Sequence, residues 1–283
     1  MEILELNADN VTDYEDILDQ DISENIGREF YRGIVAVEDG NAPKGAMIWE
    51  YKDLEEDADT NAEICFLRSE GSEVIRSLLS DFETMAEDSE VKGVFFELND
   101  LSEETKQGFT DDGFTLSAVE GRDMIVRVAD LKSLASLKKK TRDNIVGISE
   151  LMELQFMQGV TNCLFHGEKG LVEDLEYLDK DWFDEIISSA VIMDGKVSGL
   201  FLVHRLPSGD LMPVLLTAIG PDFKTDLLQM LVFSAQKASE QCTGDTKVIC
   251  RRHNKEVAAI TKRLFAGKTG SEVTRGEKSG EKG

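Results

Sequence analysis

Two short segments of this sequence carry residue types that can hold an anion. Arg68 stands three residues before Gly71, and Ser72 follows at the start of a predicted helix. Gly220 precedes a second predicted helix that has Lys224 and Thr225 in its first turn. A helix N-terminus presents unpaired backbone N–H groups, and glycine lets a ligand approach the backbone closely. Both segments are therefore candidate phosphate sites.

Each segment also has a plain structural interpretation. Glu70 and Glu73 would repel a phosphate, and Ser72 is a common helix-capping residue type. The second segment has no further glycine after Gly220 and is also typical of an ordinary connection from a strand to a helix. The residues alone leave both alternatives open.

Two Cys-x2-His pairs suggest a different chemistry. Cys163 with His166 and Cys250 with His253 would supply four ligands of the kind that zinc binds tetrahedrally. The first pair falls late in a predicted helix and the second crosses a predicted strand end, so core packing is the better interpretation. The sequence therefore predicts no metal. His204 stands alone on a strand and is typical of a surface or hydrogen-bonded core histidine.

The elements that position these residues repeat along the chain. In the first half, hydrophobic patterning predicts strands at 34–37, 45–49, 62–67 and 91–98, and a helix from 71 to 85. In the second half it predicts strands at 145–148, 190–192, 199–203, 211–219 and 247–250, with helices at 151–165, 171–187, 222–239 and 254–265. The turn Asp39-Gly40 recurs as Asp194-Gly195, which indicates a duplicated domain. The first copy adds a predicted hairpin at 114–128.

This order of elements resembles the GNAT superfamily of acyl-CoA-dependent N-acetyltransferases. The chain looks like a tandem pair of GNAT domains, each a mixed, mostly antiparallel α/β (α+β) sheet flanked by helices. The resemblance covers residues 1–130, an acidic domain, and 143–267, a truncated one, joined by a basic linker at 131–142. The Gly-, Lys-, Glu- and Ser-rich end at 268–283 is predicted to be disordered.

The resemblance implies roles for particular residues. In the family a loop of the pattern Gln/Arg-x-x-Gly-x-Gly/Ala holds the coenzyme pyrophosphate; Arg68 and Gly71 match it, while Glu73 departs from it. A general base often lies on the fourth strand, where this chain has Glu63, which is equally typical of an outward-facing strand residue. The leaving thiolate is often protonated by a Tyr, in whose place the two copies carry Phe109 and, approximately, Thr261. The implied pyrophosphate-binding residues are Arg68, Gly71, Ser72, Gly220, Lys224 and Thr225.

Charge limits the classes of partner. The net charge is −25, and the whole excess lies in residues 1–130, which hold 35 acidic and 10 basic residues. Such a charge repels nucleic acid and anionic membranes and attracts cationic amines. There is no signal peptide pattern and no apolar run long enough for a membrane span. The four cysteines form no CxxC pair, so a reducing, cytoplasmic location is expected.

Two functions remain open from the sequence. The first is an N-acyltransferase, with N-acetyl transfer as its usual form, that uses acetyl-CoA or another acyl-CoA as co-substrate and an amine as acceptor, a cationic amine being one option. The second is a non-catalytic tandem module that binds a ligand or partner, which the missing Tyr residues favour. Either is compatible with a dimer. The first copy keeps more motif residues, so any catalysis is expected there.

Overall fold

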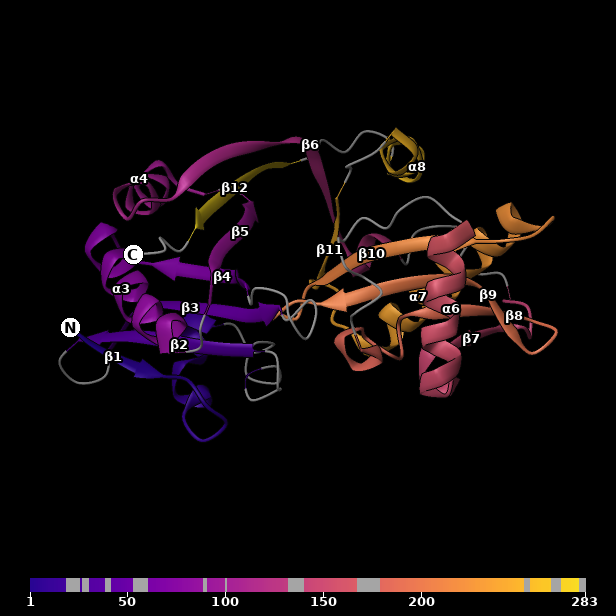
Figure 1. The fold of residues 1–283 in the computed structure, drawn as a ribbon, viewed down its shortest axis with the longest axis horizontal. Helices are drawn as coiled ribbons and strands as arrows, with labels where there is room; N and C mark the ends of the chain where they lie inside the picture. The colour runs from indigo at the N-terminus through magenta and orange to yellow at the C-terminus, as the bar shows by residue number, and fades with distance from the viewer. Residues whose placement is uncertain are drawn as a thin grey trace. The chain divides into compact units, whose positions relative to one another are not determined.

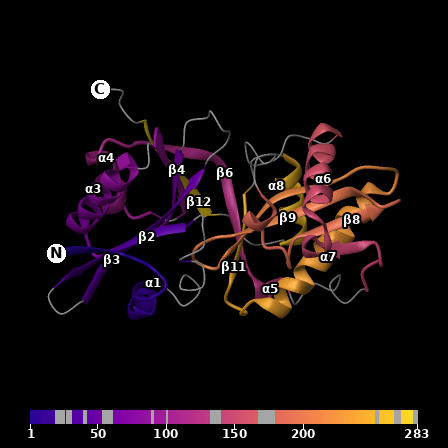
Figure 2. The ribbon, with the colours of Figure 1, turned by 60° about the horizontal axis from the view of Figure 1, so that its bottom comes forward.

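The structure is a computed structural model of the whole chain. It describes residues 1–18, 26, 31–38, 42–52, 61–88, 91–99, 101–131, 140–166, 179–251, 255–265 and 271–279. Much of the predicted basic linker, the acidic stretch 53–59 and His253 lie outside these residues. Figure 1 shows the fold, and Figure 2 shows it after a turn about the horizontal axis.

The chain divides into two compact units. The first consists of Met1–Arg122, Leu206–Gly209 and Ser271–Gly283, and the second of Asp123–Arg205 and Asp210–Gly270. Each unit is described by itself below. The division between them falls inside one strand, β6 (Thr115–Arg127), eight residues before the end of the predicted first domain at 130.

The sheet of the first unit has the strand order β1-β2-β3-β4-β5-β12-β6. Its first four strands are antiparallel neighbours, β4 and β5 are parallel, and β12 is antiparallel to β5. The elements of this unit, besides β6, are β1 (Glu2–Glu5), η1 (Val11–Tyr14), α1 (Glu15–Leu18), β2 (Tyr31–Glu38), β3 (Ala42–Lys52), β4 (Asn61–Ser69), α3 (Ser72–Asp88), β5 (Gly93–Asn99), α4 (Glu103–Asp111) and β12 (Ser271–Ser279).

The sheet of the second unit repeats this scheme in the order β7-β8-β9-β10-β11-β6. Again the first four strands are antiparallel neighbours, β10 and β11 are parallel, and the closing strand, here the end of β6, is antiparallel to β11. Its other elements are α5 (Val128–Leu131), β7 (Ile145–Gly147), η3 (Ile148–Glu150), α6 (Glu153–His166), η5 (Lys180–Trp182), β8 (Ser189–Met193), β9 (Lys196–Arg205), β10 (Leu211–Ala218), α7 (Phe223–Gln241), β11 (Lys247–Cys250) and α8 (Lys255–Leu264).

Local sequence explains the central elements. On α3 the residues Val74, Ile75, Leu78 and Leu79 recur at helical spacing, and all are buried against the first sheet. The predicted turn of the second unit forms at Asp194-Gly195, where both residues have positive φ, as a two-residue hairpin turn requires. In this unit α6 and α7 cover opposite faces of the sheet (Figures 1 and 2).

The predicted hairpin at 114–128 was wrong. Strand β6 continues without a break through Glu120 and Gly121, where the hairpin turn was expected. The strand expected to return beside it is replaced by one from the far end of the chain. Sequence order alone does not reveal this, because the replacing strand lies about 150 residues further on.

The predicted disorder of the C-terminal tail was also wrong for Ser271–Ser279, which form β12. Val273 is buried, and Gly276 lies so close to Phe96 that a Cβ atom would stand 2.2 Å from its ring. Arg275 pairs with Glu97, and Lys278 pairs with Glu83 and Asp112. Composition predicted disorder because the tail is rich in polar and charged residues. Partners on β5, on α3 and at the end of α4 hold these residues in place, and composition does not reveal such partners.

The predicted helix at 171–187 is not helical in its described part. Lys180–Trp182 form a single 3-10 turn, and Glu185–Ile187 form another turn. Asp184 accounts for this departure. Its side chain accepts hydrogen bonds from the Ile186 and Ile187 amides and forms an ion pair with Arg205. Such side-chain bonding to nearby amides offers the backbone an alternative to a helix. No described helix has both the length and the apolar character needed to cross a bilayer.

Candidate functional site

In both units the parallel strand pair opens at a bulge. The pairing of β4 with β5 ends at Ile64 and Phe96, and Cys65 is the extra residue in the register between β4 and β3. The pairing of β10 with β11 consists of Leu211 and Val248, and Val214 is the extra residue between β10 and β9. A bulge bends its strand and ends pairing, so each unit has a place where its two parallel strands separate.

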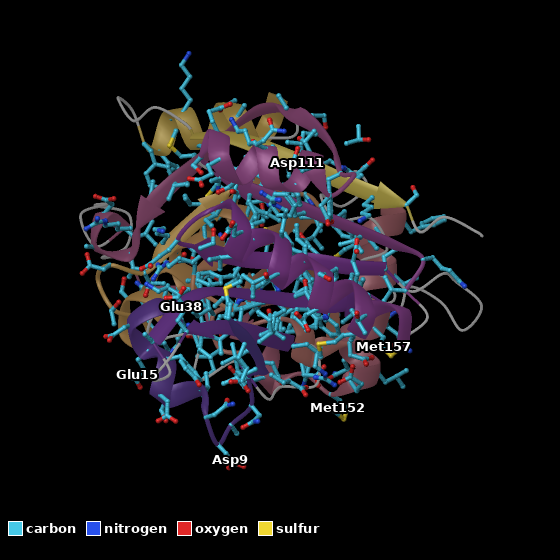
Figure 3. All side chains as sticks on the ribbon, turned by 90° about the vertical axis from the view of Figure 1, so that its left-hand side faces the viewer. Asp9, Glu15, Glu38, Asp111, Met152 and Met157 are labelled. Atoms are coloured by element: carbon cyan, nitrogen blue, oxygen red, sulfur yellow. The ribbon has the colours of Figure 1, made fainter. Side chains whose placement is uncertain are left out.

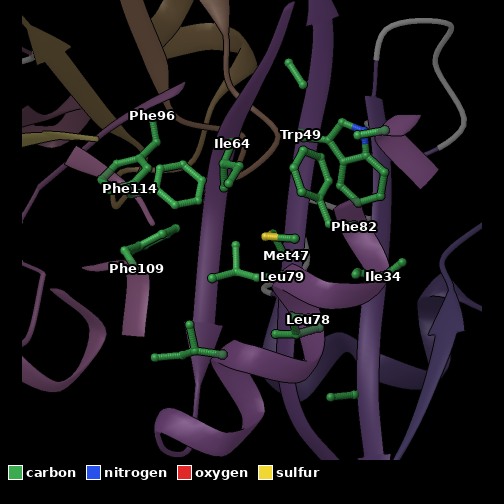
Figure 4. Packing of buried hydrophobic residues seen from close by; sticks show 14 of the residues in the cluster. Ile34, Met47, Trp49, Ile64, Leu78, Leu79, Phe82, Phe96, Phe109 and Phe114 are labelled. Carbon is green, nitrogen blue, oxygen red and sulfur yellow. The ribbon is translucent and has the colours of Figure 1, made fainter. Parts of the chain in front are cut away.

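In the first unit this opening is packed shut. The rings of Phe96, Phe109 and Phe114 are at most 4% exposed, and their centroids lie 4.1 to 5.7 Å apart. Figure 4 shows them beside Ile64 and Leu79, in the same cluster as Trp49 and Phe82. Phe109 thus stands in the core, at the place where the family resemblance puts a Tyr. Among the described residues this leaves no room for a ligand between β5 and α4.

The predicted phosphate site at the start of α3 already holds a carboxylate. The Ser72 amide donates a hydrogen bond to Glu104 Oε1 at 3.0 Å, from the first turn of α4. Gly71 has a φ of 128°, which favours glycine, and Lys44 pairs with Glu70 at 2.9 Å. A carboxylate at a helix N-terminus makes the interaction that a phosphate would make. The resemblance could not reveal this, because Glu104 comes from another helix.

Arg68 has a structural contact in place of a free guanidinium. Its Nη1 donates to the carbonyl of Ile17 at 2.8 Å, and its charged group lies 5.6 Å from the Phe66 ring centroid. These contacts tie β4 to α1. The structure therefore brings Arg68, Gly71 and Ser72 to one end of β4, where the Ser72 amide and the Arg68 Nη1 already have partners.

Glu63 lies directly opposite Glu50 in the β3–β4 register. Carboxylate oxygens of Glu50 and Glu63 and the sulfur of Cys65 all lie within 4.8 Å of one another. Glu50 is 1% exposed, and the Cys65 thiol donates to the Glu63 carbonyl at 3.3 Å. The sequence interpretation missed Glu50, because the predicted strand 45–49 ends one residue before it whereas β3 continues to Lys52.

The second unit keeps an open cleft where its parallel strands separate. A cavity of about 160 Å³ lies between β10, β11, α7 and α8. All but four of its lining residues have pure hydrocarbon side chains, among them Leu211, Leu216, Leu231 and Phe265. The separation of β10 from β11 thus creates space in this unit, whereas three phenylalanines fill it in the first.

Helix α7, which lines this cleft from Leu228 onward, begins without a side-chain cap. The side chain of the capping residue Asp222 makes no capping hydrogen bond, in contrast to the Glu104 contact at the start of α3. The Phe223, Thr225 and Asp226 amides donate to the backbone carbonyls of Gly220 and Asp222. Gly220 has a φ of 117°, and a Cβ atom there would meet nothing within 4 Å. Lys224 and Thr225 are exposed in the first turn, as is the capping position Asp222. Three of the six predicted pyrophosphate-binding residues therefore lie at an accessible helix end.

Three polar residues of the cavity wall, Ser234, Arg251 and Thr261, have partners outside the lining. Ser234 Oγ lies 3.0 Å from Ser189 Oγ, and the Thr261 hydroxyl donates to the Ala258 carbonyl at 3.2 Å. Arg251 lies 3.7 Å from the buried carboxylate of Asp123. The described lining residues include neither a carboxylate nor an imidazole.

The other candidate histidine and cysteine positions have structural surroundings. Burial raises the pKa of Cys163 to about 12, so this thiol stays protonated and is a poor metal ligand. His204 is buried, stacks on Trp182 with ring centroids 3.6 Å apart, and its Nδ1 lies 2.8 Å from the Trp182 carbonyl. These contacts indicate a core histidine, as the sequence interpretation favoured.

Comparison with known proteins supports the fold. No protein-family model and no curated protein matches the sequence. A tandem GNAT protein from the clavulanic acid biosynthesis pathway, solved without AcCoA, has a TM-score of 0.65 at 11% identity over 100% of this chain and 99% of that one. A GCN5-related N-acetyltransferase from Kribbella flavida scores 0.50 at 12% identity over 83% and 87% of the two chains.

A third solved structure extends this likeness. The GCN5-related glucosamine N-acetyltransferase region of a fungal multi-domain GH3 β-N-acetylglucosaminidase scores 0.54 at 13% identity, over 98% of this chain and 38% of that one. Together these likenesses show that the chain has the tandem GNAT fold, which confirms the predicted fold class and the resemblance drawn from the order of elements.

Proposed function

We propose that this protein is an acyl-CoA-dependent N-acyltransferase and that the cleft of its second unit holds the acyl-CoA. One observation carries the proposal: the separated strands β10 and β11 border an apolar cavity that α7 lines from Leu228 onward, and the start of α7 has no side-chain cap. Apolar walls suit the acyl and pantetheine part of the co-substrate, with acetyl-CoA as its simplest form. The exposed helix start that carries Gly220, Lys224 and Thr225 suits its pyrophosphate.

The reaction needs little from the protein beyond positioning. The neutral amine nitrogen attacks the thioester carbonyl carbon, the C–N bond forms and the C–S bond breaks. The proton lost by nitrogen passes to the departing thiolate, directly or through water. Because no described lining residue is a carboxylate or an imidazole, the amine would enter the cleft already neutral.

The first unit takes a supporting part in this proposal. Glu104 occupies the helix start that a pyrophosphate would need, and Phe109 with its neighbours fills the space for an acyl group. Its surface carries the acidic excess, with Asp9, Glu15, Glu38 and Asp111 exposed (Figure 3). This charge would attract a cationic amine acceptor. The cysteines Cys65, Cys163, Cys242 and Cys250 form no disulfides, which suits a reducing compartment such as the cytoplasm.

A second candidate function is a non-catalytic module that binds acyl-CoA. The observation that favours it is the same lack of an acid or base among the described lining residues. The two candidates agree on binding and differ on turnover. Incubation with acetyl-CoA and a panel of primary amines, with release of free thiol as the readout, separates them.

Titration of the whole chain with acetyl-CoA by calorimetry tests the binding site. Lys224→Gln is expected to weaken binding about two- to fivefold, the range for losing one exposed charged contact. Arg68→Gln is the matched control from the first unit and should leave the dissociation constant unchanged. No binding at millimolar acetyl-CoA would overturn the proposal. Weakening by Arg68→Gln alone would return the site to the first unit.

A further inference from the structure

The cavity of the second unit is larger than an acetyl group needs. A cavity of about 150 Å³ lined by aliphatic side chains is known to hold benzene, a group of six carbon atoms. The cavity between β10, β11, α7 and α8 has a volume of about 160 Å³. An acetyl group has two carbon atoms and would leave most of this apolar space empty, at the cost that an unfilled cavity carries.

The walls of the cavity offer little to a polar acyl group. The hydroxyls of Ser234 and Thr261 already make hydrogen bonds, with Ser189 and with the Ala258 carbonyl. The Arg251 guanidinium lies against the carboxylate of Asp123, which is 4% exposed. The free carboxylate of a dicarboxylic acyl group would therefore lose its water in this cavity without gaining a cationic partner.

From these observations, and resting on the proposed function, we infer that the cleft selects a short apolar acyl group of about four to six carbon atoms over acetyl and over dicarboxylic acyl groups. Leu231 and Ala235 are the determining residues. Both lie on α7, line the cavity and are half-buried, so a change in the size of either side chain changes the space without removing a fully buried core residue.

The test measures dissociation constants of the whole chain for free CoA and for its acetyl, butyryl, hexanoyl, decanoyl and succinyl thioesters. Each CH2 group buried in an apolar site gives about a fourfold gain in affinity. We expect such gains from acetyl to butyryl, and from butyryl to hexanoyl until the space is full. Succinyl-CoA should bind no better than acetyl-CoA, and decanoyl-CoA no better than hexanoyl-CoA.

Three variants locate the effect. Ala235→Leu fills the cavity and should shift the preference back to acetyl, whereas Leu231→Ala enlarges it and should shift the preference to longer chains. Ala259→Leu makes the same change as the first variant at an exposed position of α8 outside the lining, so it should leave the series unchanged. The wild-type series alone remains decisive if either cavity variant fails to fold.

The outcomes separate this inference from the function beneath it. If the thioesters bind with equal affinity, or acetyl or succinyl binds best, the inference is overturned while the acyl-CoA site stands. If neither CoA nor any thioester binds, the acyl-CoA site fails and the inference fails with it. A chain-length preference that Ala235→Leu and Ala259→Leu change equally would also overturn the assignment to the cavity.

Discussion

The amide of Ser72 donates a hydrogen bond to Oε1 of Glu104 at 3.0 Å, so a side chain of α4 caps the start of α3. The corresponding helix of the second unit, α7, has no side-chain cap. The two units share one order of strands and helices but differ at the helix end that matters for anions. In the first unit a built-in carboxylate takes the anion's place.

Glu104→Ala should destabilise the protein by about 1 kcal/mol, because it removes a carboxylate that caps a helix N-terminus. Urea unfolding measures this change in the free energy of unfolding. Glu103→Ala is the matched control: its carboxylate is 91% exposed and, within the described part of the chain, pairs with Lys106, so its loss should cost less than about 0.5 kcal/mol. Equal effects of the two substitutions would show that the Ser72 contact contributes nothing.

Phe109→Tyr should not create an active first unit. Phe109 is fully buried, with its ring 4.1 Å from Phe96 and 5.0 Å from Phe114 by centroid. A hydroxyl placed there has no described partner and should cost about 1 to 3 kcal/mol of unfolding free energy. Phe165→Tyr, at a residue 82% exposed, is the control and should be nearly neutral. A gain of acyl transfer in Phe109→Tyr would contradict the closed first unit.

Lys278 should make the stability of the first unit fall at alkaline pH. Burial alone would lower its pKa, but the hydrogen bonds to Glu83 and Asp112 raise the pKa of Lys278 above its usual 10.5. A group whose pKa is raised on folding stabilises the fold below its unfolded pKa, and this contribution is lost as pH rises through the folded value. Urea midpoints between pH 9 and 12 should therefore fall more steeply for the wild type than for Lys278→Gln.

The matched control for this pH series is Lys92→Gln. Lys92 is exposed and directly precedes β5 of the same sheet. Its replacement should leave the pH dependence of the urea midpoint the same as in the wild type. At neutral pH Lys278→Gln should cost about 1 kcal/mol, since its ion pairs are partly exposed. Parallel pH profiles for the wild type and Lys278→Gln would rule out this role for the lysine.

The sequence predicted the repeated strand order because hydrophobic period and turn residues are local properties. Three predicted strands correspond to β2, β4 and β10, namely Ile34–Val37, Ala62–Leu67 and Leu211–Ile219. The predicted turn at Asp194-Gly195 also forms. Strand β12 was not predicted because its sequence is polar. Its stability comes from partners such as Phe96 and Asp112, which lie far away along the chain.

The state of each candidate site depended on contacts between elements. No local pattern links Glu104 to Ser72 or Phe109 to Phe96, and these contacts decide that the first unit is closed. In the second unit, the sequence predicted a site at Gly220 and Lys224, but it did not predict the cavity between β10, β11, α7 and α8. Its walls come from residues of β10, α7 and α8, and the sequence pattern around each of them is typical of an ordinary core residue.

Salt should weaken the capture of a cationic acceptor. The exposed acids of residues 1–130 act through solvent, where charge interactions are screened beyond about 8 Å at physiological ionic strength. Raising sodium chloride from about 0.02 to 0.5 M should raise KM for a polyamine several-fold and leave KM for a neutral hydroxylated amine nearly unchanged. Salt independence with both amines would separate the acidic excess from substrate binding.

Glu63→Gln tests the carboxylate that the resemblance marked as a base. Glu63 faces Glu50 directly across β3 and β4, and like charges in that position destabilise a sheet. The substitution should raise the free energy of unfolding by about 0.5 kcal/mol, and so should Glu50→Gln. The double variant should gain less than the sum, because either single change already relieves the repulsion.

The same variant decides where transfer takes place. If the acyl group is transferred in the cleft of the second unit, kcat/KM of Glu63→Gln stays within about threefold of the wild type. A general base contributes about 10² to 10⁴ in rate, so a loss of that size would identify Glu63 as the base. That result would place the chemistry in the first unit and leave the cavity between β10 and β11 with a binding role alone.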